Sequence, residues 1–305
     1  VTGARDRPPV PPASLVDLRG SRVVRCGPSQ RTGIFMAPST DLSHRDRVVV
    51  ISGGVRGIGR ALTDGFLAAG ARVVAFHRGE SDESKAATEA LRTQQADALS
   101  KGRLAILRAD MTKSADRTRV LTTAQDAWGR LDVVINNAGV CFRDDLTVER
   151  IGIQQEINAS APIAFAQEAA ERLRHNAHAD ARTPSRGALL AISSYVTEWP
   201  EYSSDYIHHY AHSKRALEDG MKRLALEFRP HDINVNVIGV GVVYAGMGMA
   251  TIERKEEALA NGELPVTKFA DVDAVVFEAL CLAHPRSHYK TGRVEVLDGG
   301  WNLSA

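Results

Sequence analysis

Short runs of apolar, mostly β-branched residues recur along the chain and alternate with stretches in which the apolar residues have helical spacing. The first run, residues 48–51 (VVVI), is unbroken and ends in a glycine-rich turn. A strand without polar alternation is buried on both faces, which is typical of a parallel sheet. We expect the other strands at residues 71–76, 104–107, 131–135, 187–192, 234–238 and 293–298.

The segments between these runs predict helices. Residues 60–69 and 116–128 have helical spacing and are followed by Gly70 and Gly129, and glycine commonly ends a helix. Helical patterns also cover residues 81–102 and 271–283, as well as a long stretch that contains Asn158. Strands that alternate with helices in this way indicate an α/β fold.

Residues 1–45 differ from the rest of the chain. They are rich in proline and arginine and sustain neither helical nor strand periodicity, so we expect a disordered N-terminal extension followed by one domain over residues 46–305. The arginine bias could indicate an organelle transit peptide, but the prolines would interrupt its amphipathic helix. Met36 is an alternative start of translation.

Composition narrows the function classes. The chain has 305 residues, of which 44% are hydrophobic, and a net charge of +1, so a single α/β domain is expected and nucleic acid is not. The cysteines (Cys26, Cys141 and Cys281) are scattered, which predicts neither a metal site nor a disulfide framework and favours a reducing compartment, the cytoplasm. No apolar run approaches the roughly 18–20 residues of a membrane span.

The turn after the first strand carries candidate chemistry. Gly53, Gly57 and Gly59 follow the strand and precede a helix. Glycines let the backbone approach a diphosphate closely, and the helix N-terminus offers it free N–H groups and a partial positive charge. A tight strand-to-helix turn would explain the glycines equally well, so further motifs must decide between the two.

Three motifs together resemble the short-chain dehydrogenase/reductase family. Residues 52–59 (SGGVRGIG) resemble its TGxxxGIG signature with Ser52 in place of threonine, residues 136–139 (NNAG) resemble its second signature, and residues 210–214 (YAHSK) match its Y-x-x-x-K motif. The resemblance covers residues 46–305. It implies a Rossmann-like, doubly wound parallel sheet of about seven strands in three α/β/α layers.

The resemblance also implies the cofactor, NADP(H). The second strand ends in His77 and Arg78 without an acid that would bind a ribose 2′-hydroxyl, and Arg56 lies inside the glycine turn, where cations bind a 2′-phosphate. Two solvated surface arginines are the alternative. The cofactor-binding residues implied are Ser52, Gly53, Arg56, Gly57, Ile58, Gly59, His77, Arg78, Asp110, Met111, Asn137, Ala138, Gly139, Tyr210, Lys214, Gly241 and Val243.

The same resemblance names four catalytic residues: Asn158, Ser194, Tyr210 and Lys214. Residues four apart on a helix share a face, so the Lys214 ammonium would lower the pKa of the Tyr210 phenol and suit it to general acid catalysis. In the family, the serine polarises the substrate carbonyl, and the lysine, the ribose and a water near the asparagine replenish the proton. Ser193 is the alternative serine, and we expect residues 195–209 to form a long loop.

Some positions depart from the family pattern. Val240 and Ala245 replace its usual proline and threonine after the sixth strand, and residues 246–249 (GMGM) suggest a mobile flap. His208 and His212 could in principle bind a metal, but without a third ligand we expect no metal site.

We therefore expect an NADP(H)-dependent oxidoreductase that interconverts a small-molecule ketone or other carbonyl and its alcohol. The resemblance implies a homodimer or homotetramer. A ketoreductase acting on an acyl-thioester or polyketide and a non-catalytic NADP(H)-binding regulatory protein are the alternatives. The substrate loops, residues 195–209 and 244–266, contain no pattern that names the substrate.

Overall fold

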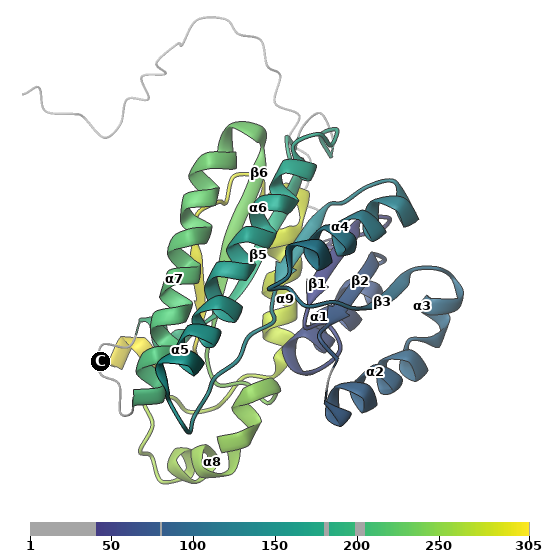
Figure 1. Ribbon diagram of the computed structural model, residues 1–305. Coiled ribbons are helices and arrows are strands. Elements are labelled where there is room, and N and C mark those ends of the chain that lie inside the picture. Colours follow the sequence, from purple (N-terminus) through teal and green to yellow (C-terminus); the bar gives the residue numbers. More distant parts are fainter. Residues whose placement is uncertain (1–40, 80, 180–182, 199–204, 305) are drawn as a thin grey trace, which may run out of the picture. The chain divides into compact units, whose positions relative to one another are not determined.

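The computed structural model describes residues 41–79, 81–179, 183–198 and 205–304, and within them the chain forms one sheet of seven parallel strands (Figure 1). The strand order is β3-β2-β1-β4-β5-β6-β7, which confirms the predicted doubly wound fold. The strands are β1 (Val48–Ser52), β2 (Arg72–His77), β3 (Leu104–Arg108), β4 (Val133–Asn136), β5 (Gly187–Ser194), β6 (Ile233–Val240) and β7 (Val294–Leu297).

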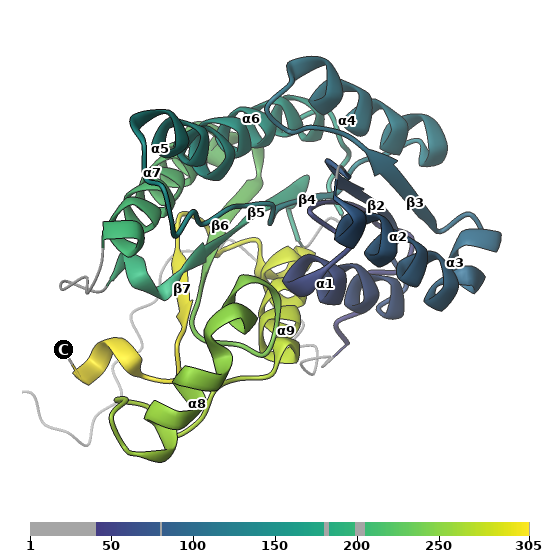
Figure 2. The ribbon, with the colours of Figure 1, turned by 60° about the horizontal axis from the view of Figure 1, so that its bottom comes forward.

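Helices cover both faces of the sheet (Figure 2). One face carries α4 (Ser114–Trp128), α5 (Val148–Gln155), α6 (Ala161–Leu173) and α7 (Asp205–Phe228); the other carries α1 (Gly57–Ala68), α2 (Asp82–Gln94), α3 (Ala96–Ser100) and α9 (Val272–Ala283). Alternate residues of β1 serve the two cores: Val48 and Val50 pack toward α4 and α6, and Val49 and Ile51 pack toward α1 and α9. This alternation is why the strand is apolar throughout.

The topology positions a crevice at the carboxyl ends of the strands. The chain runs outward from β1 to β2 and β3 and then returns to β4 on the other side of β1. Ligands bind where the strand order reverses in this way. A cavity of about 1430 Å³ lies there and is lined by the carboxyl ends of β2, β5 and β6 and the loops that follow β1 and β4. Its volume exceeds the roughly 300–1,000 Å³ of an ordinary small-molecule pocket, which leaves room for a cofactor and a substrate together.

Two segments differ from their predicted form. Residues 205–209, expected in a loop, begin α7, whereas residues 199–204 of that loop lie outside the described part of the chain. Residues 246–249, expected as a flap, belong to a short 3₁₀ helix, Gly246–Thr251. It leads into α8 (Ile252–Ala260), which stands outside the three layers (Figures 1 and 2) and buries Ile252.

The predicted N-terminal extension lies outside the described residues as far as residue 40. Residues 41–45 belong to the compact unit that begins at Asp41 and contains the sheet. The fully buried His44 ring packs edge-on against Phe66. Within the described ranges, no helix combines the length and apolarity needed to cross a membrane.

Candidate active site

The Ser52 side chain joins the two glycine-containing motifs. Its hydroxyl oxygen accepts the backbone N–H groups of Asn137 at 2.9 Å and Ala138 at 3.0 Å. In return, the Asn137 amide donates to the Ser52 carbonyl at 2.9 Å. The carboxyl ends of β1 and β4 are therefore fixed to each other at the crevice, with serine supplying the oxygen that the family's threonine would supply.

The turn between β1 and α1 fits a diphosphate. Helix α1 starts at Gly57 without a capping side chain and without an acid in its first turn, so its first N–H groups remain available to an anion in the cavity. Gly57 has a φ of +54°, and a Cβ there would lie 2.8 Å from the Cα of Gly246. A Cβ on Gly59 would lie 2.2 Å from the Gly53 carbonyl oxygen. The glycines thus allow the close packing that forms the cradle.

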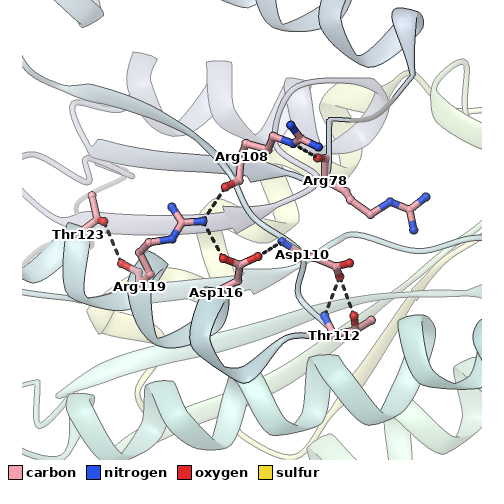
Figure 3. Close-up of polar contacts among 7 residues, drawn as sticks. All are labelled: Arg78, Arg108, Asp110, Thr112, Asp116, Arg119 and Thr123. Carbon is pink, nitrogen blue, oxygen red and sulfur yellow. Dashed lines mark hydrogen bonds and ion pairs between the residues drawn. The ribbon is translucent and has the colours of Figure 1, made fainter.

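Three arginine residues, Arg56, Arg78 and Arg108, surround the carboxyl end of β2. Arg108 of β3 pairs with His77 in the parallel register, and its Nε donates to the Arg78 carbonyl at 3.0 Å (Figure 3). The pKa of His77 is lowered first by burial and then by the charges of Arg108 and Arg56. Arg108 was not predicted from the sequence, because it reaches this place through the pairing of β3 with β2.

Glu83 is a second residue that the sequence analysis missed. Its carboxylate forms a 2.6 Å ion pair with Arg56, at the rim of the same cavity. Both side chains are largely exposed, so the pair is weak and can exchange for another anion.

Asp110 and Met111 line the cavity beyond β3. One Asp110 carboxylate oxygen accepts the Thr112 N–H at 3.0 Å and its hydroxyl at 2.8 Å (Figure 3). Asp116 accepts the Asp110 N–H at 2.8 Å and also binds Arg119. The loop is thus rigid, and the other Asp110 oxygen has no hydrogen-bond partner in the part of the chain that the structure describes.

Tyr210, Lys214 and Ser194 meet at the opposite end of the cavity. The Ser194 hydroxyl hydrogen-bonds the Tyr210 phenol. The Lys214 ammonium lies 5.8 Å from the centre of the phenol ring and donates to the Ile192 carbonyl at 2.9 Å. Ser193 instead donates to Glu218 at 2.5 Å, because successive residues of β5 point to opposite faces. Ser194 is therefore the serine that faces the phenol.

Burial controls the protonation of this pair. It raises the pKa of the Tyr210 phenol, and the hydrogen bond from Ser194 opposes the shift only in part. The expectation of a lowered phenol pKa is therefore wrong for this structure, because the desolvation of the phenolate dominates. Burial also lowers the pKa of Lys214 to about 8, against the raising effect of the Glu218 carboxylate. Tyr210 is thus a protonated donor, and Lys214 titrates just above neutrality.

Asn158 lies in a π-helical turn, Glu156–Ser160, between α5 and α6. Its side chain exchanges two 2.8 Å hydrogen bonds with the backbone N–H and carbonyl of Val140, and its amide also donates to the Ser213 hydroxyl at 2.9 Å. These bonds explain why a polar residue lies inside this helix. They also attach the loop after β4 to α7. π-Helical turns are frequent at functional sites.

The segment after β6 closes the cavity. The Gly241 N–H donates to the Leu297 carbonyl, and a Cβ at Gly241 would lie 2.7 Å from the Cα of Asp298. Val240, in place of proline, continues β6 by pairing with Ser194 and Leu297. Farther on, the Ala245 N–H donates to the Val243 carbonyl at 2.8 Å.

The rings of His208 and His212 lie 4.4 Å apart on α7. Among the described residues, no group of three His, Cys, Asp or Glu side chains gathers in a way that could hold a metal ion.

Comparisons with known proteins show the family of this chain. The model of the enoyl-(acyl carrier protein) reductase family matches residues 53–302. D-erythrulose reductase of Gallus gallus is 30% identical over 87% of this chain and 99% of its own length. The rhamnolipids biosynthesis 3-oxoacyl-[acyl-carrier-protein] reductase of Pseudomonas aeruginosa is 28% identical over 84% of this chain and 96% of its own length.

A solved structure is also similar. The RhlG/NADP active-site complex of Pseudomonas aeruginosa has a TM-score of 0.73 to this chain, with 26% identity over 87% of this chain and all of that one. The glycine turn, the Asn-Asn-Ala-Gly loop and the Tyr-Lys pair occupy one cavity of a doubly wound sheet, and a family model covers most of the chain. The chain therefore belongs to the short-chain dehydrogenase/reductase family of oxidoreductases, which use a nicotinamide cofactor.

Proposed function

We propose that this oxidoreductase uses NADP(H) to reduce a ketone or other carbonyl to an alcohol, or to catalyse the reverse reaction, with Asn158, Ser194, Tyr210 and Lys214 as its catalytic residues. The observation that carries the proposal is the protonated phenol of the partly buried Tyr210, hydrogen-bonded to Ser194 and beside Lys214 in the same cavity as the diphosphate cradle. A bound NADPH would supply a hydride for the carbonyl carbon.

The protein's own groups handle the oxygen and its proton. The Tyr210 hydroxyl donates a proton to the developing alkoxide, and the Ser194 hydroxyl holds the carbonyl oxygen in place. The Lys214 ammonium, fixed by the Ile192 carbonyl, places a positive charge near the phenolate that forms. Asn158 holds the loop after β4 against α7, which keeps Gly139 close to the Lys214 ammonium.

The cations at the end of β2 support the choice of NADP(H) over NAD(H). Arg56, Arg78 and Arg108 would bind a ribose 2′-phosphate, for which guanidinium groups are well suited. Asp110, with one uncommitted oxygen, would bind the adenine amino group. Replacing Arg56 and Arg78 with alanine should raise the NADPH dissociation constant far more than the NADH dissociation constant. Equal affinities for the two cofactors in the unmodified protein would contradict the proposal.

An acyl-thioester ketoreductase is the second candidate. It is favoured by the 28% identity to a 3-oxoacyl-[acyl-carrier-protein] reductase. A regulatory NADP(H)-binding role is the third, but it gives no reason for a phenol, a serine and a buried lysine in one cavity. A homodimer or homotetramer remains a prediction.

The test is NADPH oxidation against ketones, quinones and 3-oxoacyl-thioesters, with Tyr210→Phe measured in parallel. We expect turnover by the unmodified protein and a loss of at least about a hundredfold in kcat for the variant. The NADPH dissociation constant of Tyr210→Phe serves as the control for folding. Turnover that survives the substitution would contradict the role of Tyr210, and tight NADPH binding without turnover of any substrate would favour the regulatory role.

A further inference from the structure

The cavity that contains Tyr210 is lined by side chains of two different kinds. One wall is apolar and includes Tyr195, Val196 and Trp301, which pack with the buried Ile252 at the start of α8. The other wall carries the cationic side chains of Arg143, after β4, and of Arg254 and Lys255 on α8. An aldose or ketose alone would not require such a wall.

Lys255 is half-buried and has no hydrogen bond or ion pair to any residue that the structure describes. Burial lowers its pKa, and the charges of Arg143 and Arg254 lower it further. Placing these cations together, with Arg143 and Lys255 partly buried, is unfavourable unless an anion compensates for them. No carboxylate among the described residues raises the pKa of Lys255.

The acids of this region do not form an ion pair with Lys255 within the described ranges. Glu256 hydrogen-bonds Tyr244, and Glu263 accepts the side-chain amide of Asn261 at 3.1 Å. Glu263 and the exposed Glu257 also line the cavity, but neither is among the charges that shift the pKa of Lys255.

The cationic wall lies near the reacting end of the cavity. Cys141 is influenced by the charges of both Arg143 and Lys214, so Arg143 is close to the same thiol as the proposed catalytic lysine. Arg143 also donates to the Met247 carbonyl at 3.2 Å, which fixes it to the segment that leads into α8. The cations proposed for the cofactor, Arg56, Arg78 and Arg108, lie instead beside the carboxyl end of β2.

We propose that Lys255, together with Arg143 and Arg254, binds an anionic group, a carboxylate or a phosphate, that the carbonyl substrate carries away from its reacting carbon. The inference rests on the proposed carbonyl reductase function and narrows its substrate class to ketones with a negatively charged end. The ammonium acts as a point charge, and the two guanidinium groups can add bidentate hydrogen bonds to either oxyanion. Tyr195, Val196 and Trp301 would contact the carbon chain between the two ends.

The test compares substrates that differ only in the charge. Oxo-carboxylates of increasing chain length are paired with their methyl esters, and dihydroxyacetone phosphate is paired with dihydroxyacetone. We expect lower KM values for the charged members. Lys255→Gln should raise those KM values by about tenfold or more, as expected for a lost hydrogen bond to a charged group, and should leave the neutral members unchanged. Lys268→Gln, which removes an exposed lysine outside the cavity, is the matched control.

Calorimetry separates this inference from the proposed function. Tyr210→Phe in complex with NADP⁺ should bind the charged ketones, and the additional Lys255→Gln change should weaken that binding to a similar extent. Selectivity for one of the two series would identify the anion as carboxylate or as phosphate. Equal binding of charged and neutral members would overturn the anion site, and so would a raised NADPH dissociation constant in Lys255→Gln, which would assign these cations to the cofactor. Binding without turnover in the unmodified enzyme would instead count against the reductase proposal alone.

Discussion

The Ser52 hydroxyl accepts the backbone N–H of Asn137 at 2.9 Å, and the same oxygen accepts the next N–H, that of Ala138, at 3.0 Å. One fully buried oxygen thereby determines how the loop after β4 lies against the glycine turn after β1. Since both loops line the proposed cofactor site, the oxygen connects the stability of the fold to the affinity for the cofactor.

Replacing Ser52 with alanine should lower the free energy of unfolding by about 2 kcal/mol, because two N–H groups lose their acceptor. The NADPH dissociation constant should rise as well. Urea denaturation and fluorescence titration would measure the two effects. Ser52→Thr retains the oxygen and is the matched control. A Ser52→Ala protein as stable as the unmodified one would show that water replaces the hydroxyl.

Glu218 should control the pH dependence of the reaction through Lys214. The Lys214 pKa is about 8, and the carboxylate of Glu218 raises it, so the ammonium is lost as the pH rises through this value. We expect kcat/KM for carbonyl reduction to be level below about pH 8 and to fall above it.

Glu218→Gln should move that fall to lower pH, because the buried charge that stabilises the ammonium is gone while the Ser193 hydroxyl keeps an acceptor. Glu218→Asp, which retains the charge, should largely restore the original profile. A profile that does not move in Glu218→Gln would assign the fall to another group.

Glu83 should weaken the preference for NADP(H). Its carboxylate forms a 2.6 Å ion pair with Arg56 and would repel a 2′-phosphate bound to that arginine. We expect Glu83→Gln to lower the NADPH dissociation constant several-fold at low salt and to change the NADH constant much less, since exposed charges are screened as salt increases. Glu89→Gln is the control, because Glu89 pairs with Arg92 on the same helix. Equal changes for both cofactors would indicate an effect unrelated to the 2′-phosphate.

The sequence predicted what depends on local pattern. The glycine turn, the Asn-Asn-Ala-Gly loop and the tyrosine four residues before Lys214 are contiguous motifs, and each apolar run became a strand of the predicted sheet. Arg108 and Glu83 could not be placed in this way. They reach the site through the pairing of β3 with β2 and through the approach of α2 to the glycine turn.

Energies that depend on burial could not be predicted from the sequence either. The spacing of Tyr210 and Lys214 indicated the attraction between an ammonium and a phenolate, but it gave no measure of the desolvation that raises the phenol pKa. Similarly, α8 begins with the buried Ile252, but no motif marks that helix as the wall that brings Lys255 into the cavity.

His44 should make the fold sensitive to acid. Its Nε2–H donates to the Leu280 carbonyl at 3.1 Å, and its Nδ1 is buried without a partner among the described residues. Burial, with the charges of Arg47 and His284 and against that of Asp132, lowers the pKa of His44 to about 4. Between about pH 6.5 and pH 4, His44 is protonated in the unfolded chain but neutral in the folded protein. The free energy of unfolding therefore falls as the pH falls through this window.

The expected loss from His44 is about 3 kcal/mol across that window, at 1.36 kcal/mol for each pKa unit. His44→Phe keeps an aromatic ring against Phe66 but cannot be protonated, so its free energy of unfolding should be lower near pH 8 and decline less toward pH 4. His284→Gln should retain most of the decline, because the His284 ring is only partly buried. Urea denaturation at closely spaced pH values would separate these cases, and an equally steep decline in His44→Phe would place the acid sensitivity in other groups.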